Sequence, residues 1–228
     1  MKDAIKSSFY CDCQHPIIKE VAAILRSGDE DPAVVASRSF YFVRDKLSFG
    51  FDLFKRKASE TLRCGFGACW NKSLLLIALL RCNQIPARLG SVPLKRTFIK
   101  PAIGTWHWLA NNPYNHCFVY VYLNDRWIIL DAVLDKITYD TLFKAANVKW
   151  EIDWNGEGDV RLYTESVIGP PVMYSDIDTT LNNKVDNTEL PRFMAVIGNR
   201  FVNRSLWRKT GCHPNGWIAD HKLGSEVP

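Results

Sequence analysis

Three residues of the chain, Cys69, His116 and Asp131, have the side chains needed for nucleophilic acyl transfer. In such chemistry a thiolate attacks a carbonyl carbon, a histidine moves the proton, and a carboxylate orients the imidazole and stabilises its charged form. Cys69 opens a long apolar segment rich in leucine, so we expect it at the N-terminus of a helix that is buried all round. Helix-terminal amides and a nearby imidazolium can lower a thiol pKa from about 8.5 to about 3.5.

The segment from 116 to 131 is typical of a hairpin that brings His116 and Asp131 together. Strand-forming residues precede and follow the turn formers Asn124-Asp125. A two-residue turn pairs Leu123 with Arg126, and this register places His116 and Asp131 on one face as diagonal neighbours. Their Cα atoms would then lie about 7–8 Å apart. We therefore predict a hydrogen bond of about 2.7–2.9 Å between the imidazole and the carboxylate.

Two amphipathic helices are predicted before the buried one. Residues 16–28 repeat apolar side chains at helical spacing, and Gly28 is a suitable end. The pair Asp31-Pro32 is an N-cap followed by proline at the first helical position, which predicts a helix to about Lys46. A strand should follow Ile85, and residues 138–147 should be helical.

Residues 95–115 are expected to form a loop of a length that favours a binding loop or a lid. It contains Trp106, His107 and Trp108, which we take, with Trp70, as the candidate substrate-binding residues. The alternative is ordinary packing within the loop.

The C-terminal part is predicted to add a further helix and irregular structure. We expect a catalytic domain over residues 1–150 and an extension over 151–228 that packs on it. The segment 190–209 places five large apolar residues on one helical face: Leu190, Phe193, Met194, Ile197 and Phe201. We expect this helix to cover the core rather than lie on a membrane, because its cations are scattered and no second anchor is visible.

The composition is that of a soluble globular protein. The chain has 228 residues, 47% hydrophobic and 23% charged, which suits one generous domain. A net charge of +5 without runs of like charge does not indicate nucleic acid as a partner. No apolar stretch of signal-peptide or membrane-span length is evident, so the cytoplasm is the default location and no membrane partner is expected. We predict neither a metal site nor a cofactor, because Cys11, Cys13 and His15 lack the usual zinc spacing.

Three sequence motifs resemble the core of the transglutaminase-like superfamily. They are the run Gly67–Ser73 around Cys69, the run Leu79–Arg88, and His116 followed by Trp127 and Leu130-Asp131. The resemblance covers roughly residues 60–135. It implies an α+β fold related to papain-like cysteine proteases, with a mainly antiparallel sheet packed on helices. It also implies Cys69 as nucleophile, His116 as general base and acid, and Asp131 as the group that orients the histidine.

The expected activity is acyl transfer through a thioester on Cys69, without a cofactor. With water as acceptor the protein would be a peptidase or amidase, and with an amine a transglutaminase-type acyltransferase. The substrate would be a peptide, an amide or a thioester. One alternative is a cyclase or amide synthase that acts on small molecules bound to a carrier as thioesters, which a closed aromatic pocket would favour. Another is a binding module with an inactive triad. No calcium-loop pattern is present, so protein cross-linking of the animal type is not implied.

Overall fold

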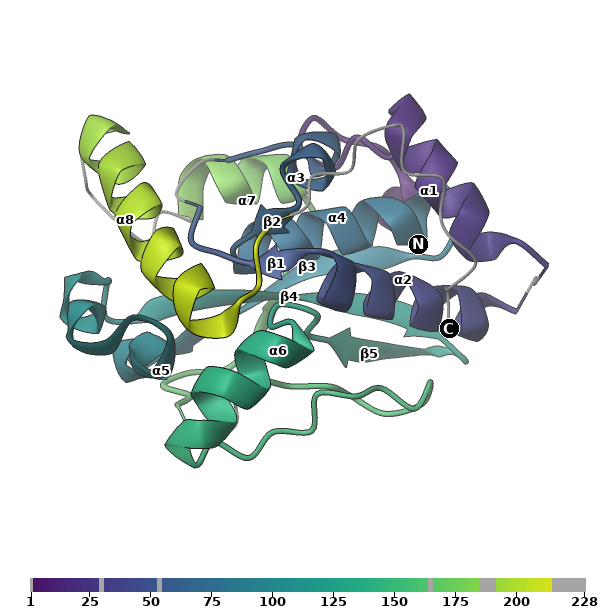
Figure 1. Cartoon of the computed structure of the whole chain (residues 1–228). Helices are drawn as coiled ribbons and strands as arrows, with labels where there is room; N and C mark the ends of the chain where they lie inside the picture. The colour runs from purple at the N-terminus through teal and green to yellow at the C-terminus, as the bar shows by residue number, and fades with distance from the viewer. Residues whose placement is uncertain (1, 29–30, 53–54, 164–165, 185–191, 215–228) are drawn as a thin grey trace.

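A four-stranded antiparallel sheet forms the centre of the protein (Figure 1). The computed structural model describes residues 2–28, 31–52, 55–163, 166–184 and 192–214. The strand order is β5-β4-β3-β6, where β3 is Ala87–Leu94, β4 Tyr114–Leu123, β5 Arg126–Leu130 and β6 Val172–Met173. A separate parallel pair, β1 (Ser48–Phe49) and β2 (Phe66–Gly67), immediately precedes the buried helix. The predicted class, α+β with a mainly antiparallel sheet packed on helices, is confirmed.

Helix α4 (Cys69–Cys82) lies against β3 and β4 and fills the core. All its residues from Cys69 to Arg81 are buried, as the continuous apolar run predicts. A fully buried leucine or isoleucine side chain contributes about 1.5–3 kcal/mol relative to an exposed one, so this helix is a major source of stability. Helices α1 (Pro16–Arg26), α2 (Pro32–Lys46) and α3 (Ala58–Cys64) pack around it (Figure 1).

The first two helices follow the predicted pattern. In α1, the buried residues are Ile18, Val21, Ala22 and Leu25, the apolar stripe of the sequence. In α2, the Asp31 side chain accepts a hydrogen bond from the Ala33 amide at 2.8 Å, so it caps the helix. The predicted boundaries are confirmed to within two residues.

The hairpin between β4 and β5 has the predicted register. Leu123 pairs with Arg126, and the pairing runs to Val119 opposite Leu130. Asn124 and Asp125 have φ of 49° and 60°, the left-handed conformation that a two-residue hairpin turn requires. Because the turn fixes the register, it also fixes which side chains share a face.

The loop predicted for residues 95–115 is instead a series of short helical turns. These are η2 (Arg96–Ile99), α5 (Lys100–Ile103) and η3 (Gly104–Leu109), and β4 begins at Tyr114 after residues 110–113. The prediction was wrong because Phe98, Ile99 and Ala102 are buried at helical spacing and anchor the turns. The apolar pattern formed by these residues covers too few positions to be recognised as helical from the sequence.

The remaining elements lie outside the central layer. They are η1 (Lys2–Ile5), α6 (Lys136–Thr138), η4 (Tyr139–Phe143), η5 (Lys144–Ala146), α7 (Ile177–Lys184) and α8 (Arg192–Thr210). The consecutive elements from α6 to η5 match the helix predicted over 138–147. Among the described residues, no helix is long and apolar enough to span a membrane.

Helix α8 is present, but its predicted inward face is wrong. Ile197 and Phe201 are 66% and 65% exposed, whereas Asn203 and Leu206 are buried. Leu190 lies outside the described residues, as do the side chains of Phe193 and Met194.

The orientation of α8 is set by hydrogen bonds to the backbone after β1. The Asn203 carboxamide accepts from the Phe51 amide at 2.7 Å and donates to the Phe51 carbonyl at 2.8 Å. The Trp207 indole donates to the Phe49 carbonyl at 3.0 Å. Each satisfied buried backbone group avoids a cost of about 1–3 kcal/mol, so these three hydrogen bonds favour the observed orientation of α8.

Candidate active site

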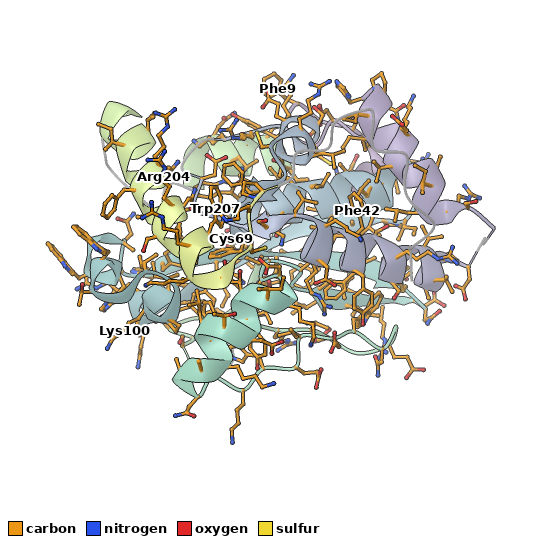
Figure 2. All side chains as sticks on the ribbon, viewed as in Figure 1. Phe9, Phe42, Cys69, Lys100, Arg204 and Trp207 are labelled. Carbon is orange, nitrogen blue, oxygen red and sulfur yellow. The ribbon has the colours of Figure 1, made fainter. Side chains whose placement is uncertain are left out.

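The structure brings Cys69, His116 and Asp131 together in the interior. Cys69 is the first residue of α4, His116 lies on β4, and Asp131 directly follows β5. His116 Nε2 lies 2.6 Å from Asp131 Oδ2, slightly shorter than predicted. The hydrogen bond and charge of the same imidazole lower the pKa of Cys69. Cys69 lies at the end of α4 nearer to α8 (Figure 2).

The imidazole is held in place on several sides. The rings of Phe98 and Tyr163 flank it, with centroids 5.0 and 5.8 Å from its own. The second Asp131 oxygen accepts a hydrogen bond from the Val133 amide at 3.4 Å. His116 and Asp131 are each 1% exposed and Cys69 is 3% exposed. The aromatic rings therefore exclude water from the three side chains.

The environment favours a thiolate and an imidazolium. Hydrogen bonding from the Cys117 thiol, followed by the hydrogen bond and charge of His116, holds the pKa of Cys69 well below its usual range despite burial. Burial lowers the pKa of His116, but the Asp131 charge and hydrogen bond outweigh it and raise that pKa to about 10. Between these two pKa values the pair is ionised, which is the reactive form of a cysteine nucleophile.

Tyr114 and Cys117 also interact with Cys69, and the sequence reasoning missed Tyr114. The Tyr114 hydroxyl hydrogen-bonds Cys69, and burial together with the negative Cys69 raises the pKa of Tyr114. The backbone amide of Cys117 also donates to Cys69. The pairing of β4 with β5 ends at Val119, so residues 114–118 of β4 are not paired with β5. The two-residue period that links Tyr114 to His116 on one strand face was the available signal.

A close approach between Gly67 and Asn71 shapes the start of α4. The Asn71 side chain accepts a hydrogen bond from the Ala68 amide at 3.0 Å and so caps the helix. A Cβ on residue 67 would lie 2.6 Å from the Asn71 Cβ, which no side chain tolerates. Glycine at 67 therefore permits the capped helix start that presents Cys69.

The four predicted substrate-binding residues have different surroundings. Trp70 is 4% exposed, and its indole nitrogen has no hydrogen-bond partner within the described part of the chain. Trp106 and Trp108 are 53% and 60% exposed, and Trp106 lies edge-on to Phe201 of α8. His107 Nδ1 lies 2.8 Å from the Gly104 carbonyl within η3. Their role in substrate binding stays a prediction.

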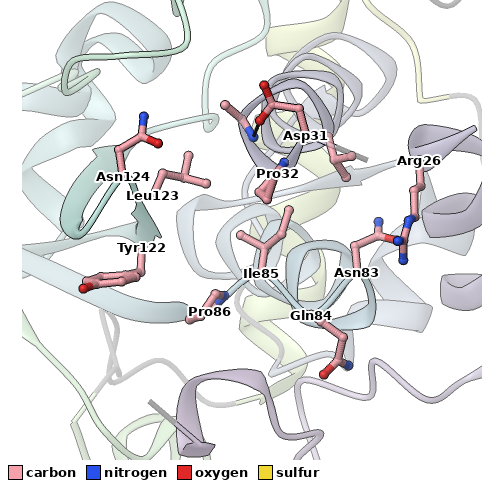
Figure 3. Close-up of a pocket in the computed structure, with 12 residues that line it drawn as sticks. Arg26, Asp31, Pro32, Asn83, Gln84, Ile85, Pro86, Tyr122, Leu123 and Asn124 are labelled. Carbon is pink, nitrogen blue, oxygen red and sulfur yellow. Dashed lines mark hydrogen bonds between the residues drawn. The ribbon is translucent and has the colours of Figure 1, made fainter. Parts of the chain in front are cut away.

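A pocket of about 430 Å³ lies at the opposite end of α4 (Figure 3). Arg26, Asn83, Gln84 and Tyr122 are among the residues that line it. A 14-residue helix is about 20 Å long, so this pocket is remote from Cys69. It is not part of the candidate active site.

The chain is similar to known proteins at the level of family and overall structure. The sequence profile of the transglutaminase-like superfamily matches residues 19–132, half of the chain. A proposed cysteine protease from Cytophaga hutchinsonii has a TM-score of 0.45 at 20% identity, over 57% of this chain and 40% of that one. A transglutaminase from red sea bream has a TM-score of 0.41 at 13% identity, over 93% and 43%.

The chain spans less than half of each of these two solved structures. No curated protein matches its sequence. The profile match includes Cys69 and both partners that the fold brings to it, His116 and Asp131. On this match, the chain belongs to the transglutaminase-like superfamily.

Proposed function

We propose that the protein catalyses cysteine-dependent acyl transfer, with Cys69 as nucleophile, His116 as acid and base, and Asp131 as the group that orients and charges the imidazole. The observation that carries the proposal is the 2.6 Å contact between His116 Nε2 and Asp131 Oδ2, in an imidazole whose hydrogen bond and charge also lower the pKa of Cys69. A histidine that was only a core residue would not need both a buried carboxylate and a thiol as partners.

The reaction proceeds in two half-reactions that share one proton carrier. The Cys69 thiolate attacks the substrate carbonyl carbon, and the leaving group departs with the proton of the His116 imidazolium, which leaves a thioester. The neutral imidazole then takes a proton from the acceptor, water or an amine, as the acceptor attacks the thioester. The thiolate leaves, and the original ion pair is restored.

The start of α4 supplies part of the stabilisation of the tetrahedral intermediate. The Cys69 amide is at the first helical position, where it has no acceptor within the helix. The Tyr114 hydroxyl already donates to the sulfur and is a second donor close to the oxyanion that forms there. Loss of one oxyanion donor costs about 100- to 1,000-fold in rate in well-studied enzymes.

The enclosure of the site favours a small acyl donor as the second candidate function. Phe98 and Tyr163 flank His116, and Cys69 is only 3% exposed. A long polypeptide needs an open groove on both sides of the scissile bond, whereas a small acyl group needs only a narrow entrance. The candidate activity is therefore cyclisation or amide synthesis from a carrier-bound thioester, by the same Cys69 chemistry.

Intact-mass measurement tests the proposal directly. The protein is incubated with a panel of simple acyl thioesters, aryl amides and glutamine-containing peptides, and each sample is quenched in acid. We expect at least one donor to leave its acyl mass on the protein, and the donor class separates small thioesters from polypeptides. The Cys69→Ala variant should remain unmodified.

Cys82→Ala provides the matched control, because Cys82 is a half-buried free thiol at the far end of the same helix. It should acylate like the wild type. Acylation of Cys69→Ala would refute the nucleophile assignment. If no donor acylates the protein and Cys69 does not react selectively with a thiol electrophile at about pH 6, a non-catalytic binding module is the better description.

A further inference from the structure

An exposed surface on α8 and η3 combines large apolar side chains with cations, and we refer to it as the aromatic-basic surface. Its apolar members are Trp106, Trp108, Ile197 and Phe201, each more than half exposed. The rings of Trp106 and Phe201 lie edge-on with centroids 6.4 Å apart, so the two elements present one surface. Exposed apolar side chains gathered in this way mark interaction sites on soluble proteins.

The outward face of α8 continues from apolar to cationic residues. Ile197, Phe201, Arg204 and Arg208 follow one another at spacings of four, three and four, which is one helical stripe. Arg204 and Arg208 are exposed. Figure 2 shows Arg204 on α8 and Lys100 on α5 on the same side of the molecule. The two elements contact each other.

The charge of this region is entirely positive in sequence. Residues 95–110 and 192–210 together contain eight lysines and arginines and no aspartate or glutamate. The nearest packed element, η4, contributes Asp140, whose carboxylate is paired with Lys136 and Lys144 at 3.8 and 3.5 Å. The aromatic-basic surface therefore complements an anionic partner.

We propose that the aromatic-basic surface binds peripherally to a bilayer that contains anionic lipids. Tryptophan rings partition into the interface between headgroups and acyl chains, and arginines beside them attract anionic headgroups. The apolar side chains project from two adjacent helical elements, and stable interfacial binding requires two such signals, apolar insertion and cationic attraction.

The tertiary structure supplies the second anchor that the sequence of α8 lacked. In the sequence, the two tryptophans of η3 are about 90 residues from α8, and they were assigned to a substrate loop. In the fold, Trp106 contacts Phe201. Binding at this surface involves none of Cys69, His116 and Asp131, so it does not depend on the proposed catalytic triad.

Vesicle sedimentation tests the proposal with the whole chain. The probes are vesicles of phosphatidylcholine alone and of phosphatidylcholine with 30% phosphatidylserine, at 0.1 M and 0.5 M salt. We expect binding to the anionic vesicles at low salt and at least a tenfold weaker partition coefficient at high salt, because salt screens the cationic part. Binding to the neutral vesicles should be at least tenfold weaker.

One double variant and one single variant separate the apolar and cationic parts of the surface. Trp106→Ala with Phe201→Ala should weaken partitioning at least tenfold, and Arg204→Gln should weaken it about fivefold, the effect of one cation near an anionic surface. The matched apolar control is Phe9→Ala, since Phe9 is 60% exposed and stacks with Lys57 elsewhere on the molecule (Figure 2). It should bind like the wild type.

Three outcomes would overturn the proposal. One is equal sedimentation with and without anionic vesicles, and another is an equal loss with Phe9→Ala. The third is tighter binding to an acidic polypeptide such as polyglutamate than to the vesicles, when the Trp106 and Phe201 substitutions have no effect on this binding. That result would identify a charged protein as the partner. Acylation of Cys69 by a soluble donor should be unchanged in Arg204→Gln and Phe9→Ala, which replace none of the residues assigned to the Cys69 site, so a failure of vesicle binding leaves the proposed function intact.

Discussion

Replacing Asp131 with asparagine removes the charge that keeps the buried His116 imidazole protonated. The two groups are 2.6 Å apart and both are almost fully buried. Asp131 is the main cause that raises the pKa of His116 against the opposing effect of burial, to about 10. Without that charge, burial should bring the pKa to its ordinary value of about 6.5 or lower.

The size of the effect follows from these pKa values. At pH 8 an imidazole with a pKa of about 10 is about 99% protonated, whereas one with a pKa of about 6.5 is about 3% protonated. The imidazolium population therefore falls at least about thirtyfold. Because a contacting opposite charge shifts a pKa by about 1–3 units, the pKa of Cys69 should rise by a similar amount. The thiolate population at low pH should fall in consequence.

Alkylation of Cys69 measures this without a known substrate. The rate of iodoacetamide labelling is followed from pH 5 to 10, with peptide mass mapping to separate Cys69 from the other six cysteines. The wild type should label Cys69 at low pH because the ion pair is formed there. The Asp131→Asn variant should label it more slowly at low pH, with its labelling profile displaced to higher pH, and approach the wild-type rate near pH 10, where the thiol ionises unaided.

Asp52→Asn is the matched control, because the Asp52 carboxylate is equally buried and is paired with Arg56 rather than with the histidine. Its labelling profile should match the wild type. A wild-type profile in Asp131→Asn would refute the reasoning, since the carboxylate would then not control the charge of His116. Thermal unfolding of each variant shows whether it is folded under the conditions of the assay.

Two further substitutions test the surroundings of the site. Tyr114→Phe removes a hydroxyl that donates to Cys69. The pH at which Cys69 labelling reaches half its maximal rate should therefore rise by about one to two units, and acylation should slow about 100-fold. Faster acylation would mean that the tyrosine obstructs the site. Lys72 is fully buried, and burial lowers its pKa from 10.5 to about 8 in the folded chain. Between pH 8 and 10.5 the unfolded chain therefore binds more protons than the folded chain, so the free energy of unfolding rises with pH. Urea titrations from pH 7 to 11 should show a rise of about 3 kcal/mol in the unfolding free energy of the wild type, and this rise should be absent in Lys72→Met. The same dependence of unfolding free energy on pH in both proteins would contradict the prediction.

Local sequence was sufficient to place His116 beside Asp131. The turn formers Asn124 and Asp125 adopt positive φ, and a two-residue turn leaves one possible pairing for the strands on either side. Side-chain alternation then decides the shared face without any long-range information. The buried helix was equally readable, because a segment that is apolar all round can be stable only in the core.

Residues that close the site from a distance were decided by the tertiary structure alone. Phe98 and Tyr163 flank His116 from segments 18 residues before it and 47 residues after it. Nothing in either segment indicates which strand it will cover. Cys117 follows His116 in the sequence, yet its effect on the pKa of Cys69 depends on the packing of α4 against β4.

The orientation of α8 shows the same division. Its apolar period predicts a helix with an apolar face, but the period is identical whether that face lies inward or outward. The choice was made by Asn203 and Trp207, whose side chains hydrogen-bond the backbone after β1, more than 150 residues earlier. The sequence by itself determined the local conformations and the pairing of His116 with Asp131. Only the tertiary structure decided which surfaces remain exposed, because exposure depends on partners that are distant along the chain.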